Sequence, residues 1–511
     1  MRIINKMILM ITLFIFTIIF VSSFFLDSSV YYNQNTIISL LICALIMGIW
    51  FAIMKKIRKS GPISSKKEIL FLIIIFALIT LIQIISIKQL GIYPHSDFNI
   101  IFDNALNYVK NGTREGAVYY EYFQLFPHNI MMFKLFCFAI SVGGIFNISP
   151  QLSCIILNII FIDAAIFLLY VTIKRLYTKE IGFFALILVF FFLPIFIYTT
   201  TFYSDTLSLV IPIAFVYVFS FIEDNKINKK NTILFIVVGL MLFWGTEIKI
   251  TSIFILIALT INYCLKNKIK YIFCNYTILF VTFVFLLFIF NKTVVENKKY
   301  SFKVNDYGSI PYTHFIMMGV EDVDRDNSGR NSYGGYNNDD LLTTKSYENG
   351  KIASKKDLEE AIKRVKKFGI IGYSDFLIKK SVNIWTDGLY FSDVCISITP
   401  IDTNTYLRKT IFNNIENRKL LANFCQGVQY AFIISLMLGS IKSLLKKKYE
   451  NIDYLALTIL GTFVFLLLWE GRSRYIFNLI PIFVLLITNY YYNVLLDKEK
   501  TKVPIKKIKN S

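Results

Sequence analysis

One carboxylate in this 511-residue chain stands where a membrane enzyme would need it. Asp97 opens an amphipathic segment, residues 96–112, directly after a long apolar run. At the first turn of a helix the backbone dipole favours an ionised carboxylate. A charged carboxylate at a lipid–water boundary is suited to accept a proton from an incoming hydroxyl group. We therefore predict a catalytic role for Asp97, with a solvated helix residue as the alternative.

Cations occur at two other points where apolar runs are interrupted. Arg472 and Arg474 lie in the short polar segment between the last two runs. The planar fork of arginine pairs with two phosphate oxygens at once. At least one of the two is therefore predicted to bind a phosphate; the alternative is that both only extend to the membrane surface. Lys249 could bind the same phosphate, held in place by Glu247, unless the two form only an ion pair within a hairpin turn.

Asp205 falls at another predicted outer turn, in the segment Tyr203-Ser204-Asp205. Its carboxylate could orient an acceptor molecule, or it could cap the helix that follows. The three histidines lie in external segments without metal-ligand spacing, and the seven cysteines have no regular spacing. A metal site is not indicated, although a divalent ion remains possible.

These residues must be positioned by membrane-spanning helices. Hydrophobic residues make up 55% of the chain, charged residues 17%, and the mean hydropathy is +0.57. Apolar runs of about 20 residues, enough to cross a hydrocarbon core of about 30 Å, recur along most of the sequence. The sequence predicts an all-α polytopic membrane protein with roughly 12–14 crossings. Residues 7–26 are expected to remain as a span, because no small-residue cleavage site follows them.

The net charge of +20 comes from lysine and arginine clusters between the apolar runs. This pattern predicts cytoplasmic loops at the clusters, contact with anionic lipids, cytoplasmic termini, and no binding of nucleic acid. The basic pair Lys174-Arg175 requires an odd number of crossings before it. One of the runs 130–147 and 152–173 is therefore expected to be re-entrant or broken.

Three regions follow from this topology. Residues 1–291 form an N-terminal transmembrane bundle, with an external loop at 89–127 that carries an interfacial helix capped by Ser96. Residues 292–420 form a small extracytoplasmic region, with a loop at 321–340 and a helix from Ser354 to Gly369. Residues 421–511 form the last transmembrane helices and a basic cytoplasmic tail.

Two short motifs accompany the acidic residue of the first external loop. One leads into the next apolar run and the other contains the paired arginines: Tyr122-Phe123-Gln124-Leu125-Phe126-Pro127-His128-Asn129 and Glu470-Gly471-Arg472-Ser473-Arg474-Tyr475. In this order the chain resembles the GT-C superfamily of membrane glycosyltransferases. It is most similar to bacterial relatives of the protein O-mannosyltransferases and aminoarabinose transferases, glycosyltransferase family 39.

The resemblance implies a GT-C-like bundle, a polyprenyl-phosphate sugar donor and basic residues that hold the donor phosphate. The catalytic acid would be Asp97, and the phosphate ligands would be Arg472, Arg474 and Lys249. Supporting or substrate-binding roles would fall to Glu470, Tyr475, Tyr122, His128, Asn129, Asp205 and Glu247. Ser96 stands where relatives often carry a second acid, so a metal held by an acidic pair is not implied.

The expected function is inverting transfer of a sugar from a lipid phosphate to an acceptor hydroxyl group, at the outer face of the cytoplasmic membrane. The acceptor would be a cell-envelope protein, teichoic acid, glycolipid or polysaccharide. A lipid-linked oligosaccharide polymerase is the first alternative, and it would require Arg325, Arg330 or Arg364. A lipid-linked sugar flippase or other transporter is the second, and it would require charges deep inside the spans.

Overall fold

The computed structural model describes residues 2–26, 35–324, 331–446 and 453–500, and within them the chain is an all-α polytopic membrane protein. In the first part of the chain its helices are α1 (Arg2–Ser22), α2 (Thr36–Lys59), α3 (Ser65–Leu90), α4 (Ser96–Asn111), α5 (Tyr122–Leu125), η1 (Pro127–Asn129), α6 (Ile130–Ile145), α7 (Pro150–Leu176), α8 (Lys179–Val189), α9 (Pro194–Ile197), η2 (Tyr198–Thr200), α10 (Ser204–Leu207), α11 (Val210–Phe219), α12 (Lys229–Ile248), η3 (Ile250–Ser252), α13 (Ile253–Lys266), α14 (Ile269–Phe290) and η4 (Asn291–Val295).

The rest of the chain adds a short hairpin and further helices: α15 (Tyr312–Gly319), β1 (Asp322–Asp324), β2 (Asn331–Tyr333), α16 (Asn338–Ser346), α17 (Gly350–Trp385), α18 (Ser392–Ile398), η5 (Arg408–Phe412), α19 (Ile415–Lys446), η6 (Asp453–Leu455), α20 (Ala456–Leu468), η7 (Ser473–Leu479) and α21 (Ile480–Lys500). In the described residues, nine helical runs are long and apolar enough to cross a membrane. A tenth candidate is bent by 68° between α8 and α9, and three shorter apolar helices lie at 204–219, 250–266 and 453–468.

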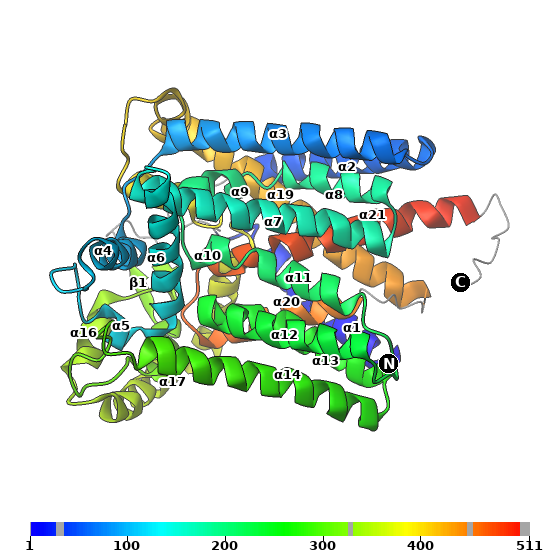
Figure 1. Ribbon diagram of the computed structural model, residues 1–511. Coiled ribbons are helices and arrows are strands. Elements are labelled where there is room, and N and C mark those ends of the chain that lie inside the picture. The colour runs from blue at the N-terminus through cyan, green and yellow to red at the C-terminus, as the bar shows by residue number, and fades with distance from the viewer. Residues whose placement is uncertain (1, 27–34, 325–330, 447–452, 501–511) are drawn as a thin grey trace.

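Local sequence sets where the spans begin and end. Ser149 caps α7 by accepting a hydrogen bond from the Leu152 amide, and Pro150 takes the first helical position, where a missing N–H costs nothing. Lys174 and Arg175 stand in the last turn of α7, where the helix dipole favours positive charge. The turn from α2 to α3, which follows a similar basic cluster, lies at the same end of the bundle (Figure 1).

The bundle has two distinct ends. The start of α1 and the end of α21 lie at one of them, together with the α2–α3 and α7–α8 connections (Figure 1). The other end carries α4, α5, α6, β1 and α16 (Figure 1). This separation agrees with the arrangement predicted from the basic loops, in which both termini share one side and the external segments share the other.

Helices α4 and α6 lie across the end of the bundle, at a steep angle to α3 and α7 (Figure 1). They pack on each other, and α4 buries the apolar side predicted for it, including Phe98 and Ile101. The run that does not pass along the bundle is therefore α6, although its length and composition would allow a span. The bend lies in the run that follows α7, where Pro194 begins α9 after α8.

Three local predictions need correction. His95, not Ser96, is the N-cap residue of α4, although Gly112 does end the helix in the left-handed region (φ 74°). Asn349, not Ser354, caps α17, because its side chain accepts hydrogen bonds from two amides of the first turn. The expected loop at 321–340 contains the hairpin β1–β2, in which Asp322 pairs with Tyr333.

The region between α14 and α19 is fastened to the bundle at both ends. Arg114, in the segment between α4 and α5, is buried and donates to the backbone oxygens of Tyr300 and Ser301, both at 2.6 Å. Towards its other end, Trp385 of α17 packs against Phe16 of α1 with ring centroids 5.3 Å apart. The region between α14 and α19 is thus held against the bundle.

Candidate functional site

Asp97 occupies the first turn of α4 and is half-buried. His95, two residues before Asp97, is buried, and its Nε2 atom lies 2.9 Å from the backbone oxygen of Cys395. This contact helps to fix the start of the helix that carries Asp97. The Tyr203 hydroxyl donates a hydrogen bond to Asp97 Oδ2 at 3.4 Å. The predicted base therefore faces a tyrosine from the α10 segment, about 100 residues further along the chain.

A second tyrosine, Tyr122, lies beside the same carboxylate. Burial, and then the neighbouring Asp97 carboxylate, raise the pKa of the Tyr122 hydroxyl well above its usual value. The Asn129 amide group donates to the Tyr122 oxygen at 2.8 Å, and His128, the residue before it, is exposed. Of the motif Tyr122–Asn129, the structure thus places Tyr122 beside Asp97, with its hydroxyl kept protonated, and Asn129 against Tyr122.

The cations meet at Asp205, which is buried with 5% of its side chain exposed. Lys249 Nζ forms an ion pair with Asp205 Oδ1 and keeps 9% exposure. Arg474 Nη1 lies 3.6 Å from Asp205 Oδ2 and keeps 24% exposure. Burial lowers the pKa of Lys249, and the Asp205 carboxylate opposes that shift. One carboxylate therefore holds two cations that remain partly open to solvent.

Tyr203 lies between Asp97 and Arg474. Its hydroxyl contacts Asp97, and the Arg474 guanidinium lies 5.7 Å from the centroid of its ring. Tyr475 completes this wall, since the Arg474 guanidinium lies 5.2 Å and the Lys249 ammonium 5.4 Å from its ring centroid. Asp97 and the cationic pair consequently belong to one cluster, which we call the charged cluster: Asp97, Tyr203, Asp205, Lys249, Arg474 and Tyr475.

Glu247 and Asp205 do not make the contacts that the sequence predicts for them. In the described part of the chain no ion pair or hydrogen bond joins Glu247 to Lys249, because Glu247 lies on the last turn of α12 while Lys249 has turned towards Asp205. Asp205 is not a helix cap either, since the N-cap residue of α10 is Tyr203. The prediction that Glu247 holds Lys249 is wrong, and Asp205 does so.

The side chains of Arg472 and Arg474 have different neighbours. Arg472 is directed to Phe391, whose ring centroid lies 4.7 Å from the guanidinium, whereas Arg474 points into the charged cluster. Glu470 is buried beside them, with its amide donating to the Phe315 backbone oxygen at 2.8 Å. Burial raises the pKa of the Glu470 carboxyl, and Arg474 opposes that shift.

Sequence reasoning missed Lys380, a fully buried lysine that fixes the segment before the arginines. Its ammonium donates to the backbone oxygens of Gly319 (2.7 Å), Trp469 (2.8 Å) and Leu467 (3.1 Å). Its spacing could have indicated this burial, because Lys380 lies four residues after Phe376 and four residues before Ile384, on the apolar side of α17. It missed Tyr203 as well, for which the sequence offers no signal beyond its place next to Asp205.

Of the three arginines expected for a polymerase, the structure describes only Arg364. Arg325 and Arg330 lie outside the described residues. Arg364 is bound by three carboxylates, with its nitrogens 2.7 Å from Asp340, 2.8 Å from Glu321 and 3.3 Å from Glu360. Across the residues that the structure covers, no group of three or more His, Cys, Asp or Glu side chains is placed to hold a metal ion.

Comparison with known proteins gives a family. A family model described as "conserved hypothetical integral membrane protein" matches residues 1–494. The chain belongs to this family. No curated protein and no solved structure matches the chain significantly. The family and the apolar helices together establish an integral, multi-pass membrane protein, and the family description carries no activity.

Proposed function

We propose that this protein is a glycosyltransferase of the GT-C type. It transfers a sugar from a polyprenyl-phosphate donor to an acceptor hydroxyl group of the cell envelope. The observation that supports this proposal is the charged cluster, in which a half-buried carboxylate and two partly exposed cations lie on either side of Tyr203. The cluster lies with α4 and α10, away from the end that carries both termini (Figure 1).

The proposed reaction needs a base and a charge-matched leaving group. The acceptor hydroxyl group gives its proton to Asp97 while its oxygen attacks the anomeric carbon of the donor sugar. The bond from that carbon to the phosphate oxygen breaks, and the phosphate leaves with the electron pair. Attack from the side opposite the phosphate inverts the configuration of the sugar.

Arg474 and Lys249 would stabilise the departing phosphate. The Arg474 side chain keeps 24% exposure, so part of it stays open to an incoming phosphate oxygen. Asp205 holds both cations without neutralising both charges. The cationic pair therefore keeps a net positive charge for an anionic ligand.

The proposed orientation places the site outside the cell. Excess lysine and arginine mark cytoplasmic loops, and the basic ends of α2 and α7 lie at the end of the bundle that carries both termini (Figure 1). The termini are then cytoplasmic, and the charged cluster faces the exterior of the cytoplasmic membrane. A polyprenyl donor would reach it from the outer leaflet.

A strain comparison tests this function. Surface glycans are profiled from a deletion strain complemented with the wild-type gene, with Asp97→Asn or with Asp103→Asn. Asp103 is a matched control on the same helix, since its carboxylate only accepts a hydrogen bond from the Val118 amide at 2.8 Å. Loss of one sugar with Asp97→Asn and retention with Asp103→Asn is the expected result. A normal profile with Asp97→Asn present in the membrane would contradict the proposal.

A further inference from the structure

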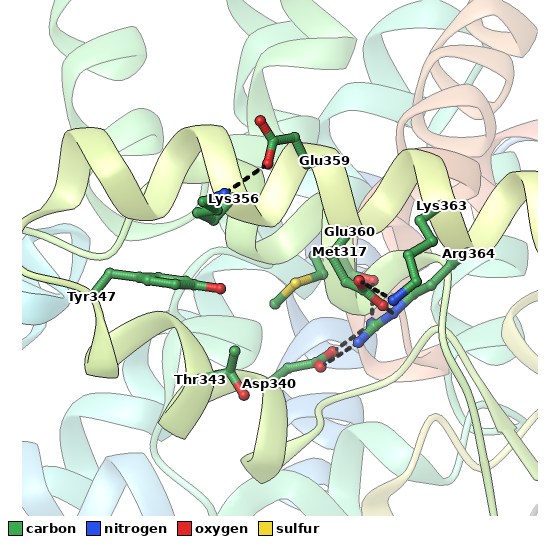
Figure 2. Close-up of a pocket in the computed structure, with 9 residues that line it drawn as sticks. All are labelled: Met317, Asp340, Thr343, Tyr347, Lys356, Glu359, Glu360, Lys363 and Arg364. Carbon is green, nitrogen blue, oxygen red and sulfur yellow. Dashed lines mark hydrogen bonds and ion pairs between the residues drawn. The ribbon is translucent and has the colours of Figure 1, made fainter.

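A second site lies in the extracytoplasmic region, apart from the charged cluster. A pocket of about 490 Å³ opens between α15, α16 and α17 (Figure 2). This volume falls in the range of about 300–1,000 Å³ that is typical of small-molecule sites. Its walls carry mostly polar side chains, with Met317 as the single aliphatic contribution among the residues that line it. The pocket therefore offers hydrogen bonds rather than a large apolar surface.

The charges of the pocket balance. Three carboxylates (Asp340, Glu359 and Glu360) line it together with three cations (Lys356, Lys363 and Arg364). They are paired with one another: Lys356 lies 3.2 Å from Glu359, Lys363 lies 3.1 Å from Glu360, and Arg364 binds Asp340 through two nitrogens. A charged ligand would gain no net attraction here and would have to break an existing pair.

Ion-paired side chains still have hydrogen-bonding capacity. Each carboxylate oxygen can accept more than one hydrogen bond, and an ammonium group has three donors. Arg364 and Asp340 present these donors and acceptors at fixed positions, because Arg364 is held by three carboxylates and only 16% of its side chain is exposed. The pairs Lys356–Glu359 and Lys363–Glu360 are more exposed and form the rim of the pocket. Hydroxyl groups, which both donate and accept, match such a surface better than ions do.

An aromatic ring completes the pocket. Tyr347 extends from the end of α16 towards Met317 across the floor of the pocket (Figure 2). A tyrosine presents a flat apolar face together with a polar edge. A sugar ring has the matching form, with C–H groups on its faces and hydroxyl groups around its rim. A peptide would instead need apolar side-chain pockets or a free strand edge.

Helix α16 ties the pocket to the segment that leads to the charged cluster. Asp340, Thr343 and Tyr347 face the pocket from α16 and the residue that follows it. Lys345 on the same helix pairs with Glu121 at 3.1 Å, and the next residue, Tyr122, lies beside Asp97. A ligand seated in the pocket would thus rest on a helix that is ion-paired to the segment beside the predicted base.

We propose that this pocket binds an uncharged saccharide unit of the acceptor, so that the acceptor is a glycan. The proposal rests on the function proposed above, and it names the class of acceptor. The bound unit places its ring on Tyr347 and its hydroxyl groups on the paired charges, and a more distant part of the same glycan reaches Asp97.

Binding of defined oligosaccharides tests the pocket without any transfer reaction. Purified full-length protein in detergent is titrated with fluorescent tetrasaccharides. Neutral cellotetraose, maltotetraose and tetra-N-acetylchitotetraose are compared with anionic tetragalacturonate and cationic tetraglucosamine. We expect at least one neutral probe to bind more tightly than both charged ones. Absence of binding by all the neutral probes, or preference for a charged probe, would overturn the proposal.

Two tyrosine variants make the test specific. Tyr347→Ala should weaken the binding of the neutral probe by about 3- to 10-fold, the loss expected for one aromatic contact. Tyr312→Ala is the control, because Tyr312 is 77% exposed and lies outside the pocket. Equal weakening by both variants would contradict the assignment.

Asp97→Asn separates this proposal from the proposed function. The variant should bind the probe as tightly as the wild type while it transfers no sugar. If it still transferred sugar and bound the probe through Tyr347, the pocket would stand and the catalytic proposal would fall. If it lost transfer while no neutral probe bound the wild type, the opposite conclusion would follow.

Discussion

Asp205 shows how one side chain can decide the charge of a site. It is buried and holds two cations, so its removal leaves Lys249 and Arg474 without their shared partner. Breaking a buried ion pair from one side costs about 3–5 kcal/mol. Asp205→Ala should lower the free energy of unfolding by that order, as measured by denaturant unfolding in detergent. Glu223→Ala, at an exposed pair with Lys226, should change it far less.

Asp357, on α17, gives a pH prediction for the region between α14 and α19. Burial raises its pKa to about 6, from about 3.9 in an unfolded chain. The protonated form is favoured by folding, so this stabilisation is complete below about pH 4 and is lost as the pH rises through about 6. Relative to Asp357→Asn, the wild type should therefore lose about 2–3 kcal/mol between about pH 4 and about pH 7.

The measurement is the difference between the two unfolding curves at each pH. His314 titrates nearby, since burial lowers its pKa to about 4, but it is present in both proteins and cancels in the difference. Asparagine can keep the hydrogen bond that Asp357 Oδ1 accepts from Thr344 at 3.0 Å. A difference that stays constant from about pH 4 to about pH 7 would contradict the raised pKa.

Residue types and spacing predicted which side chains meet, but not every partner. Asp97, Lys249 and Arg474 stand out in the sequence because charge at the edge of an apolar run is costly unless it is used. Glu247 was assigned to Lys249 because it is close in sequence. The true partner, Asp205, is 44 positions away and is brought in by tertiary packing, which spacing along one segment cannot reveal.

At the scale of elements, periodicity predicted α4 better than α6. Helix α4 has an apolar side and a polar side, a pattern that specifies a helix lying across a boundary. Helix α6 is apolar except for Lys134 and Ser141 and could pass for a span, so only the count of crossings before Lys174 indicates that one run has to differ. The orientation of α6 follows from its packing against α4. This contact cannot be predicted from the sequence of α6 alone.

Helix α17 provides a test of one backbone position. Gly369 interrupts it with φ 66° and ψ 177°, a conformation that side-chain-bearing residues rarely adopt. Gly369→Ala should destabilise the protein by about 1–3 kcal/mol. Gly372→Ala is the control, because its added Cβ would stand 3.7 Å from Phe368, an ordinary contact. Equal effects of the two substitutions on the unfolding midpoint would argue against a break at Gly369.

At the scale of the whole molecule, the proposed orientation of the bundle in the membrane can be tested by chemical labelling of single-cysteine variants. Cys264 is exposed and Cys274 is half-buried, while the other five cysteines are buried. With these two replaced by serine, Ser346→Cys should react in intact cells with a membrane-impermeant maleimide. Ser60→Cys, exposed after α2 at the end that carries the termini, should react only after the cells are opened. The reverse pattern would place the charged cluster inside the cell.

The proposed function depends most on the role of Asp97 in transferring a sugar from a lipid phosphate. The direct measurement is transfer of a radiolabelled sugar from a polyprenyl phosphate to an envelope fraction by purified protein in liposomes. Wild type and Asp103→Asn should transfer it at similar rates, whereas Asp97→Asn should be slower by about 100-fold or more. If Asp97→Asn kept the wild-type rate, or if the wild type transferred no sugar from any polyprenyl-phosphate donor, the central claim would be contradicted.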